Sequence, residues 1–156
     1  GAVSAAASLD VSFLNVHASG GYEMMVQAQR NCAEKTKLLA VTVLTSLNED
    51  ALEEVGQGRD TVNQVVRLAT LTHKAGLSGI VCSAHEIKHI RNALPKDFIL
   101  MVPGIRPEGS DVGDQKRVMT PKEAITAGAT HLVIGRPITG AKDPAQAGRD
   151  ILASLA

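Results

Sequence analysis

Short apolar runs alternate with longer amphipathic stretches along the whole chain. The runs, rich in Val, Ile and Leu, cover residues 11–18, 38–44, 79–82, 99–106 and 131–138. Consecutive apolar residues bounded by turn signals are typical of strands that are buried on both faces, as in a parallel sheet. The pattern therefore predicts five parallel strands.

The stretches around these runs carry helix signals. Thr120 and Glu123 form a capping box around Pro121, and Gly128 ends that helix. The predicted helices cover residues 1–9, 22–35, 48–55, 61–74, 84–94 and 144–155, besides the one that begins at Pro121. Asp60 and Asp143 are expected to cap two of them. Strict alternation of strand and helix predicts an α/β fold with helices outside a parallel sheet.

Length and composition narrow the class of protein. A chain of 156 residues suits a single domain, residues 1–156, but is short for a (β/α)8 barrel of about 250 residues. The formal net charge is zero, so we expect neither nucleic acid nor an anionic membrane as partner. No apolar run reaches roughly 18 residues and no signal peptide is evident, so we expect a soluble cytoplasmic protein. Cys32 and Cys82 are expected to be reduced thiols.

Polar residues follow several predicted strands. Arg106, Gln115, Gly135 and Arg136 lie in the last two strand-to-helix loops, which commonly form a phosphate site in barrels. Arg offers a planar fork to a phosphate, and Gly lets the backbone approach an anion. The alternative is that both Arg residues are solvated loop charges. Arg106, on the longer loop, is expected to be the more solvent-screened of the two.

Three further sets of polar residues have competing interpretations. Thr45 and Ser46 end the second strand and could contact a ligand, or could cap the following helix. His85 and His89 fit the zinc motif H-E-x-x-H, but Glu86 also fits a capping box with Ser83, so we expect a solvated helix face and no metal. His17 is expected to be a hydrogen-bonded core histidine rather than part of the site floor.

Several longer motifs occur in one order and resemble a known family, orotidine 5′-monophosphate decarboxylase. They are N-V-H-A-S-G-G at 15–21, L-L-A-V-T-V-L-T-S at 38–46, V-P-G-I-R-P at 102–107, G-D-Q-x-R-V-x-T-P at 113–121 and V-I-G-R-P-I-T at 133–139. The resemblance runs over essentially the whole chain. It implies a (β/α)8 TIM barrel, of which the five units correspond to strands four to eight, an N-terminally truncated portion.

The resemblance also implies a reaction and a site. The family decarboxylates orotidine 5′-monophosphate to uridine 5′-monophosphate in pyrimidine biosynthesis, as a homodimer without cofactor or metal. Its substrate contacts fall on Thr45, Pro103, Arg106, Gln115, Gly135 and Arg136, with Ser46 as a weaker correspondence. The family's reacting Asp and Lys residues, including a D-x-K-x-x-D motif, have no counterpart in this sequence. No catalytic residue is therefore assigned, and the chain by itself is expected to be inactive.

Two alternatives to the decarboxylase stay open. One is another enzyme of the ribulose-phosphate-binding barrels, such as a hexulose-phosphate synthase, although the G-D-Q-x-R-V-x-T-P motif argues against it. The other is a non-catalytic half-barrel that binds a phosphate ligand.

Overall fold

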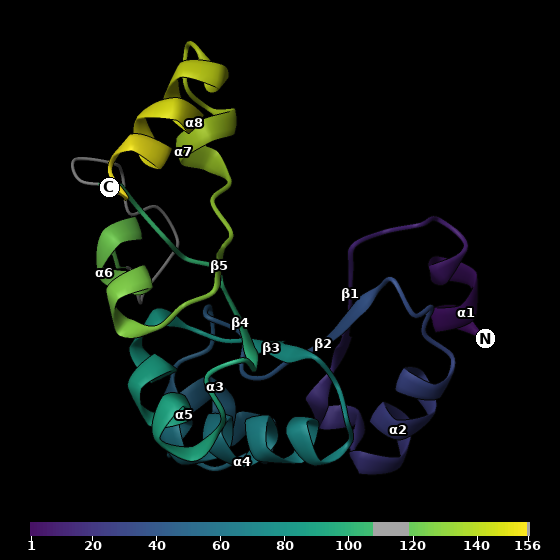
Figure 1. The fold of residues 1–156 in the computed structure, drawn as a ribbon. Helices are drawn as coiled ribbons and strands as arrows, with labels where there is room; N and C mark the ends of the chain where they lie inside the picture. Colours follow the sequence, from purple (N-terminus) through teal and green to yellow (C-terminus); the bar gives the residue numbers. More distant parts are fainter. Residues whose placement is uncertain (108–118, 156) are drawn as a thin grey trace.

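The computed structural model describes residues 1–107 and 119–155 (Figure 1). Its centre is one sheet of five parallel strands in the order β1-β2-β3-β4-β5. The strands are β1 (Phe13–His17), β2 (Lys37–Val41), β3 (Gly79–Val81), β4 (Ile99–Val102) and β5 (His131–Leu132). The strands follow one another in the sheet in the same order as in the sequence, so each strand pairs with the next strand along the chain. The predicted number of strands and their parallel arrangement are confirmed.

Helices fill the connections between the strands. They are α1 (Ala2–Ala7), α2 (Tyr22–Arg30), α3 (Glu49–Glu54), α4 (Thr61–Lys74), α5 (Ile87–Ala93), α6 (Pro121–Ala127), α7 (Arg136–Thr139) and α8 (Pro144–Ala153), with single 3₁₀ turns at Ala18–Gly20 and Ala84–Glu86. Figure 1 shows α2, α4 and α5 along one side of the sheet, while α7 and α8 extend beyond β5. Within residues 1–107 and 119–155, no helix has the length and apolar character needed to cross a bilayer.

Alternate strand residues face the helix layer and form the core. Those fully buried on this face include Leu38, Ala40, Ile80, Leu100 and Val102. They pack against apolar helix residues such as Leu68 of α4 and Ile87 of α5. Because successive side chains of a strand point to opposite faces, the intervening residues lie on the other, concave face of the sheet.

The concave face is strongly curved. The rings of Phe13 on β1 and His131 on β5 meet edge to face with centroids 5.0 Å apart. In a flat sheet the first and fifth strands would be about 19 Å apart, four spacings of roughly 4.8 Å. Side chains on the two edge strands can touch only if the sheet curls toward closure. This curvature is what a portion of a barrel requires.

Most predicted strands and helices are longer than the observed ones, and the differences are largest in the fifth strand and in the helix predicted at residues 22–35. The fifth strand stops at Leu132, and Arg136–Thr139 is helical instead of extended. The carbonyl of Gly135 accepts hydrogen bonds from the backbone N–H groups of Ile138 and Thr139, at 2.8 and 3.0 Å, and these bonds close a helical turn. The predicted helix 22–35 ends at Arg30. Thr36, which follows the predicted helix, donates a hydrogen bond from Oγ1 to the carbonyl of Val11 at 2.8 Å and so contacts the segment that precedes β1.

Locally encoded features agree with the prediction. Asp60 and Asp143 accept hydrogen bonds from the N–H groups of Asn63 and Gln146, each at 2.9 Å. Thr120 and Glu123 form the expected capping box. These interactions lower the pKa of Glu123, whose carboxylate accepts from the Thr120 side chain and backbone, and of Asp60, which accepts from Asn63.

Arg91 fastens three elements together. From α5 its guanidinium donates to the carbonyl of Gly128 through Nε at 3.1 Å and Nη2 at 2.8 Å. Nη1 donates to the carbonyls of Phe98 at 2.9 Å and Pro95 at 3.1 Å. The C-terminus of α6 and the entry into β4 are thereby fixed to α5. Partial burial lowers the pKa of Arg91.

Candidate functional site

Most of the predicted site residues gather at one edge of the sheet, because parallel strands end on the same side. Thr45 and Ser46 follow β2, Pro103 and Arg106 follow β4, and Gly135 and Arg136 follow β5. Gln115 lies outside the described residues. The remaining predicted residues therefore share the edge at which ligands bind in α/β sheets and barrels.

Backbone geometry brings Arg106 back to the edge after β4. Gly104 adopts φ +75°, a conformation that other residues rarely adopt. Ile105 then forms a parallel bridge with Met119, and the Arg106 N–H donates to the Met119 carbonyl at 3.1 Å. These contacts join the two ends of the connection between residues 106 and 119. The Arg106 side chain therefore leaves from a fixed base rather than from a free loop.

Arg106 is buried, contrary to the expectation that it is the more solvent-screened arginine. It is 8% exposed, whereas Arg136 is exposed. The Ile105–Met119 bridge explains the difference, because it draws the start of the long connection into the structure. Arg106 Nη1 donates to the carbonyl of Ile105 at 2.9 Å. Within residues 1–107 and 119–155, the ion pairs do not include Arg106. A buried guanidinium that forms no ion pair with the described carboxylates favours an anionic ligand.

Gly135 and Arg136 stand at the neighbouring strand end. The N–H of Val133 donates to the carbonyl of Val102 at 2.9 Å, which holds this segment against the end of β4. Among the described residues other than its two chain neighbours, none has a heavy atom within 4 Å of the position that a Cβ on Gly135 would take, so a ligand can approach the backbone there. Arg136 begins α7 directly after it. The two arginine-bearing segments thus leave from adjacent strands.

Thr45 and Ser46 do not cap the helix that follows them. Asn48 caps α3, with its Oδ1 accepting from the N–H of Ala51 at 3.0 Å. The helix-cap interpretation of the two hydroxyls is therefore wrong. Thr45 is half-buried and Ser46 is exposed, in a turn closed by the Leu47 N–H donating to the Leu44 carbonyl at 3.0 Å. This turn presents both hydroxyls at the same edge as the arginines.

The H-E-x-x-H motif has a structural explanation. The Ser83 N–H donates to Glu86 Oε2 at 2.8 Å, and Glu86 is only 1% exposed, which confirms its capping role. His85 and His89 are exposed on the outer side of the helix, as expected. In the part of the chain that the structure describes, no three His, Cys, Asp or Glu side chains converge as a metal site would require. Cys32 and Cys82 are free thiols.

His17 is exposed, so the expectation of a core histidine is wrong. Together with Asn15 it occupies alternate positions of β1 on the concave face, opposite the layer of α2, α4 and α5 (Figure 1). Asn15 was not identified as a candidate from the sequence. The signal was available, because polar residues at 15 and 17 alternate with apolar ones inside the run. Both side chains face the hollow of the curved sheet.

Similarity to known proteins in sequence and fold identifies the family of this chain. The profile of the "Orotidine 5'-phosphate decarboxylase / HUMPS family" matches residues 1–151. Two curated relatives are each named orotidine 5'-phosphate decarboxylase. The protein of Pseudoalteromonas atlantica is 51% identical, and the match covers 97% of this chain and 68% of that relative. The protein of Pectobacterium carotovorum is 52% identical, and the match covers 99% of this chain and 64% of that relative.

A solved structure gives the same result at the level of fold. The orotidine 5'-phosphate decarboxylase of Lactobacillus acidophilus matches with a TM-score of 0.84 and 34% identity, over 99% of this chain and 67% of that chain. The chain thus spans about two thirds of the length of these proteins. The expected α/β barrel class and the suspected resemblance are confirmed. The chain belongs to the orotidine 5'-phosphate decarboxylase / HUMPS family.

Proposed function

We propose that this chain is the phosphate- and pyrimidine-binding part of an enzyme that converts orotidine 5′-monophosphate to uridine 5′-monophosphate and carbon dioxide. The observation that carries the proposal is the buried guanidinium of Arg106 beside the Gly135–Arg136 segment. Relatives about half identical to the chain are named for this activity, which favours it over the hexulose-phosphate synthase alternative.

Two neighbouring sets of described residues are proposed to bind the two ends of the nucleotide. Arg106, Gly135 and Arg136 suit the phosphate, since guanidinium groups and open backbone bind a dianion strongly. Thr45, Ser46 and Pro103 suit the nucleoside end, where hydroxyls and an apolar ring meet a polar, flat base. Gln115 is proposed to join the phosphate contacts. Binding energy from the phosphate can lower the barrier at the distant reacting carbon.

The chemistry at the pyrimidine ring is assigned to residues outside this chain. The sequence contains no D-x-K-x-x-D motif, so we name no catalytic residue here and expect no turnover from the chain alone. We propose a reaction that needs neither cofactor nor metal, in a homodimer. Both cysteines are free thiols, which suits the reducing cytoplasm.

Activity on the nucleotide and on the nucleoside tests the proposal. The protein for this test is a full-length one, in which the segment that the relatives have and this chain does not cover is joined to the chain. Because Arg136 is exposed, Arg136→Ala is expected to weaken transition-state binding of the nucleotide, measured as kcat/KM, by roughly 1.5 to 3 kcal/mol, the range for a hydrogen bond to a charged group. Its effect on the nucleoside, which lacks the phosphate, should be negligible. Arg106→Lys keeps the positive charge but removes the planar guanidinium, and the resulting decrease in kcat/KM should also be confined to the nucleotide.

Arg67→Ala provides the matched control, because Arg67 is an exposed arginine on α4. It should leave both substrates unaffected. Equal losses on nucleotide and nucleoside for Arg136→Ala would mean that Arg136 is structural, and the phosphate assignment would fail.

A further inference from the structure

Helix α3 is attached to the turn that carries Thr45 and Ser46, and little of it is buried. It has 6 residues, and Leu52 is its one buried side chain. Helices shorter than about 12 residues are marginal without tertiary contacts. The direction in which α3 leaves the Thr45–Ser46 turn therefore depends on interactions other than its own backbone.

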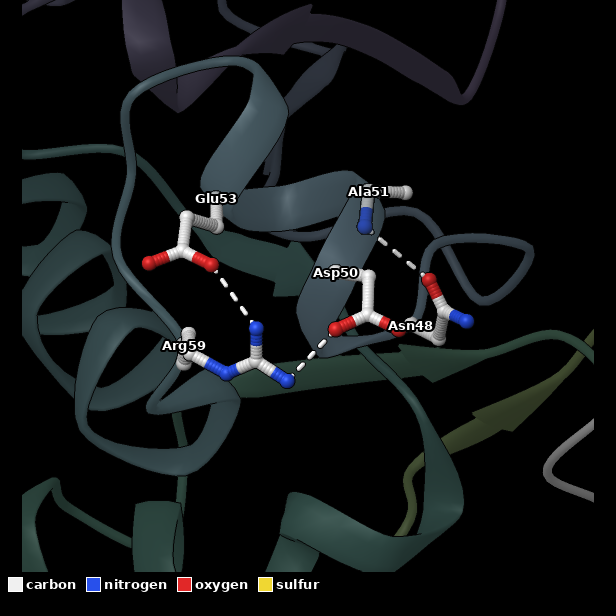
Figure 2. Close-up of polar contacts among 5 residues, drawn as sticks. All are labelled: Asn48, Asp50, Ala51, Glu53 and Arg59. Carbon is white, nitrogen blue, oxygen red and sulfur yellow. Dashed lines mark hydrogen bonds and ion pairs between the residues drawn. The ribbon is translucent and has the colours of Figure 1, made fainter.

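Arg59 supplies such an interaction (Figure 2). Its Nη1 donates to Glu53 Oε2 at 2.7 Å, and its Nη2 donates to Asp50 Oδ1 at 2.5 Å. The two carboxylates are three residues apart on one face of α3, where they would otherwise repel each other. The hydrogen bonds that Arg59 donates to Glu53 and Asp50, with the charge of Asp50, raise the pKa of Arg59. One guanidinium thus spans the length of this short helix.

The backbone after α3 is shaped to return Arg59 to it. Gly56 and Gly58 both adopt φ +75°, a conformation that suits glycine, and reverse the chain within a few residues. Arg59 is followed directly by Asp60, the N-cap of the 14-residue helix α4. Arg59 therefore joins the small helix α3 to the start of a long helix with a buried face.

We propose that Arg59 is a positioning residue for the nucleoside end of the site. By holding α3 against the start of α4, it fixes the turn that presents Thr45 and Ser46. This inference rests on the proposed function, because it assumes that those hydroxyls contact the ligand. In this proposal Arg59 acts through α3 and not by contact with the ligand.

The expected effect is modest and depends on salt. Each carboxylate contact is more than half exposed, and exposed ion pairs contribute little individually. Two contacts sharing one guanidinium correspond to a change in affinity of roughly twofold to thirtyfold. Because the contacts are exposed, about 1 M salt should remove most of the difference between the native protein and the variant.

The test measures local opening and ligand binding in the same protein. In Arg59→Gln, amide hydrogen exchange at Ala51 and Leu52 should accelerate by roughly twofold to thirtyfold, since their N–H groups bond to the Asn48 side chain and backbone. The Kd for uridine 5′-monophosphate should rise by a similar factor. The Kd for inorganic phosphate should not change, because its contacts lie on other strands.

Three variants separate positioning from general stability. Arg59→Lys, which reaches one carboxylate, should restore part of the affinity, and the double variant Asp50→Asn, Glu53→Gln should reproduce the loss. Arg67→Gln on α4 should change nothing. Unchanged exchange at Ala51 and Leu52 together with unchanged nucleotide affinity in Arg59→Gln would overturn the proposal, as would equal weakening of nucleotide and phosphate binding. If the native chain bound no nucleotide, the proposed function would fail, and the exchange measurement would still decide whether Arg59 holds α3.

Discussion

Replacing Arg91 should destabilise the fold more than replacing any neighbouring surface cation. Arg91→Met keeps most of the side-chain length and apolar stem but removes every hydrogen bond of the guanidinium. The carbonyls of Gly128, Phe98 and Pro95 then lose a charged donor at once. These carbonyls end α6 and precede β4, so the change loosens the two elements that flank the proposed phosphate site.

The magnitude follows from the geometry. A hydrogen bond to a charged group contributes about 1.5–3 kcal/mol in favourable cases. Arg91 makes four contacts to three carbonyls, but it is only partly buried, and the partial desolvation of its charge, which also lowers its pKa, offsets part of the gain. Allowing for this cost and for solvent on the Pro95 side, we expect Arg91→Met to lower the free energy of unfolding by about 2–4 kcal/mol.

Urea unfolding followed by circular dichroism measures this change. Lys88→Met, an exposed cation on the same helix, is the matched control and should alter the stability by less than about 0.5 kcal/mol. Arg91→Lys should recover only part of the loss, because an ammonium cannot reach all three carbonyls. If Arg91→Met and Lys88→Met lowered the stability equally, the guanidinium would not hold these elements together.

Three further predictions concern packing, pH and thiol reactivity. Gly79→Ala should cost about 1–3 kcal/mol in urea unfolding, because the new Cβ would collide with the backbone carbonyl and Cβ of Ile99 on β4; a variant as stable as the native protein would contradict this packing. Hydrogen bonds from Thr120 lower the pKa of Glu123 below its usual value of 4.5. They therefore stabilise the folded state at pH values above 4.5, and this stabilisation is lost as the pH falls through the lower pKa of the folded state. Glu123→Gln should therefore show a weaker acid dependence of stability than the native chain, and identical pH profiles would rule out this contribution. Burial raises the pKa of the Cys82 thiol, so a thiol reagent should modify Cys32 well before Cys82 in the folded chain, and the reverse order would contradict the burial of Cys82.

Local chemistry explains which parts of the fold were predictable from the sequence. Asp60, Asp143 and the Thr120–Glu123 pair cap helices through contacts three residues away, so the sequence alone contains the whole signal. The end of the last strand lacked such a signal. Ile138 suits a strand as well as a helix. The segment is helical because the Gly135 carbonyl accepts hydrogen bonds from two N–H groups, which the sequence does not reveal.

Exposure at the site was less predictable, because it depends on contacts between distant segments. Arg106 is buried because Ile105 pairs with Met119, across a connection whose length suggested an open loop. His17 is exposed because it lies on the concave face of the sheet, away from the helix layer, whereas the apolar run around it suggested burial on both faces. The motifs placed the candidate residues at the carboxyl ends of the strands, and the described ones lie there, whereas the difference in exposure between Arg106 and Arg136 depends on contacts between distant segments.

We propose above that the edge of the sheet after β4 and β5 binds the phosphate of a nucleotide. Calorimetric titration of the chain with uridine 5′-monophosphate and, separately, with uridine tests it most directly. One nucleotide should bind per site at least about tenfold more tightly than the nucleoside, since each 1.4 kcal/mol of phosphate contact corresponds to a factor of ten. Arg106→Lys should reduce this preference. Equal affinities for nucleotide and nucleoside, or a preference that Arg106→Lys leaves unchanged, would contradict the account.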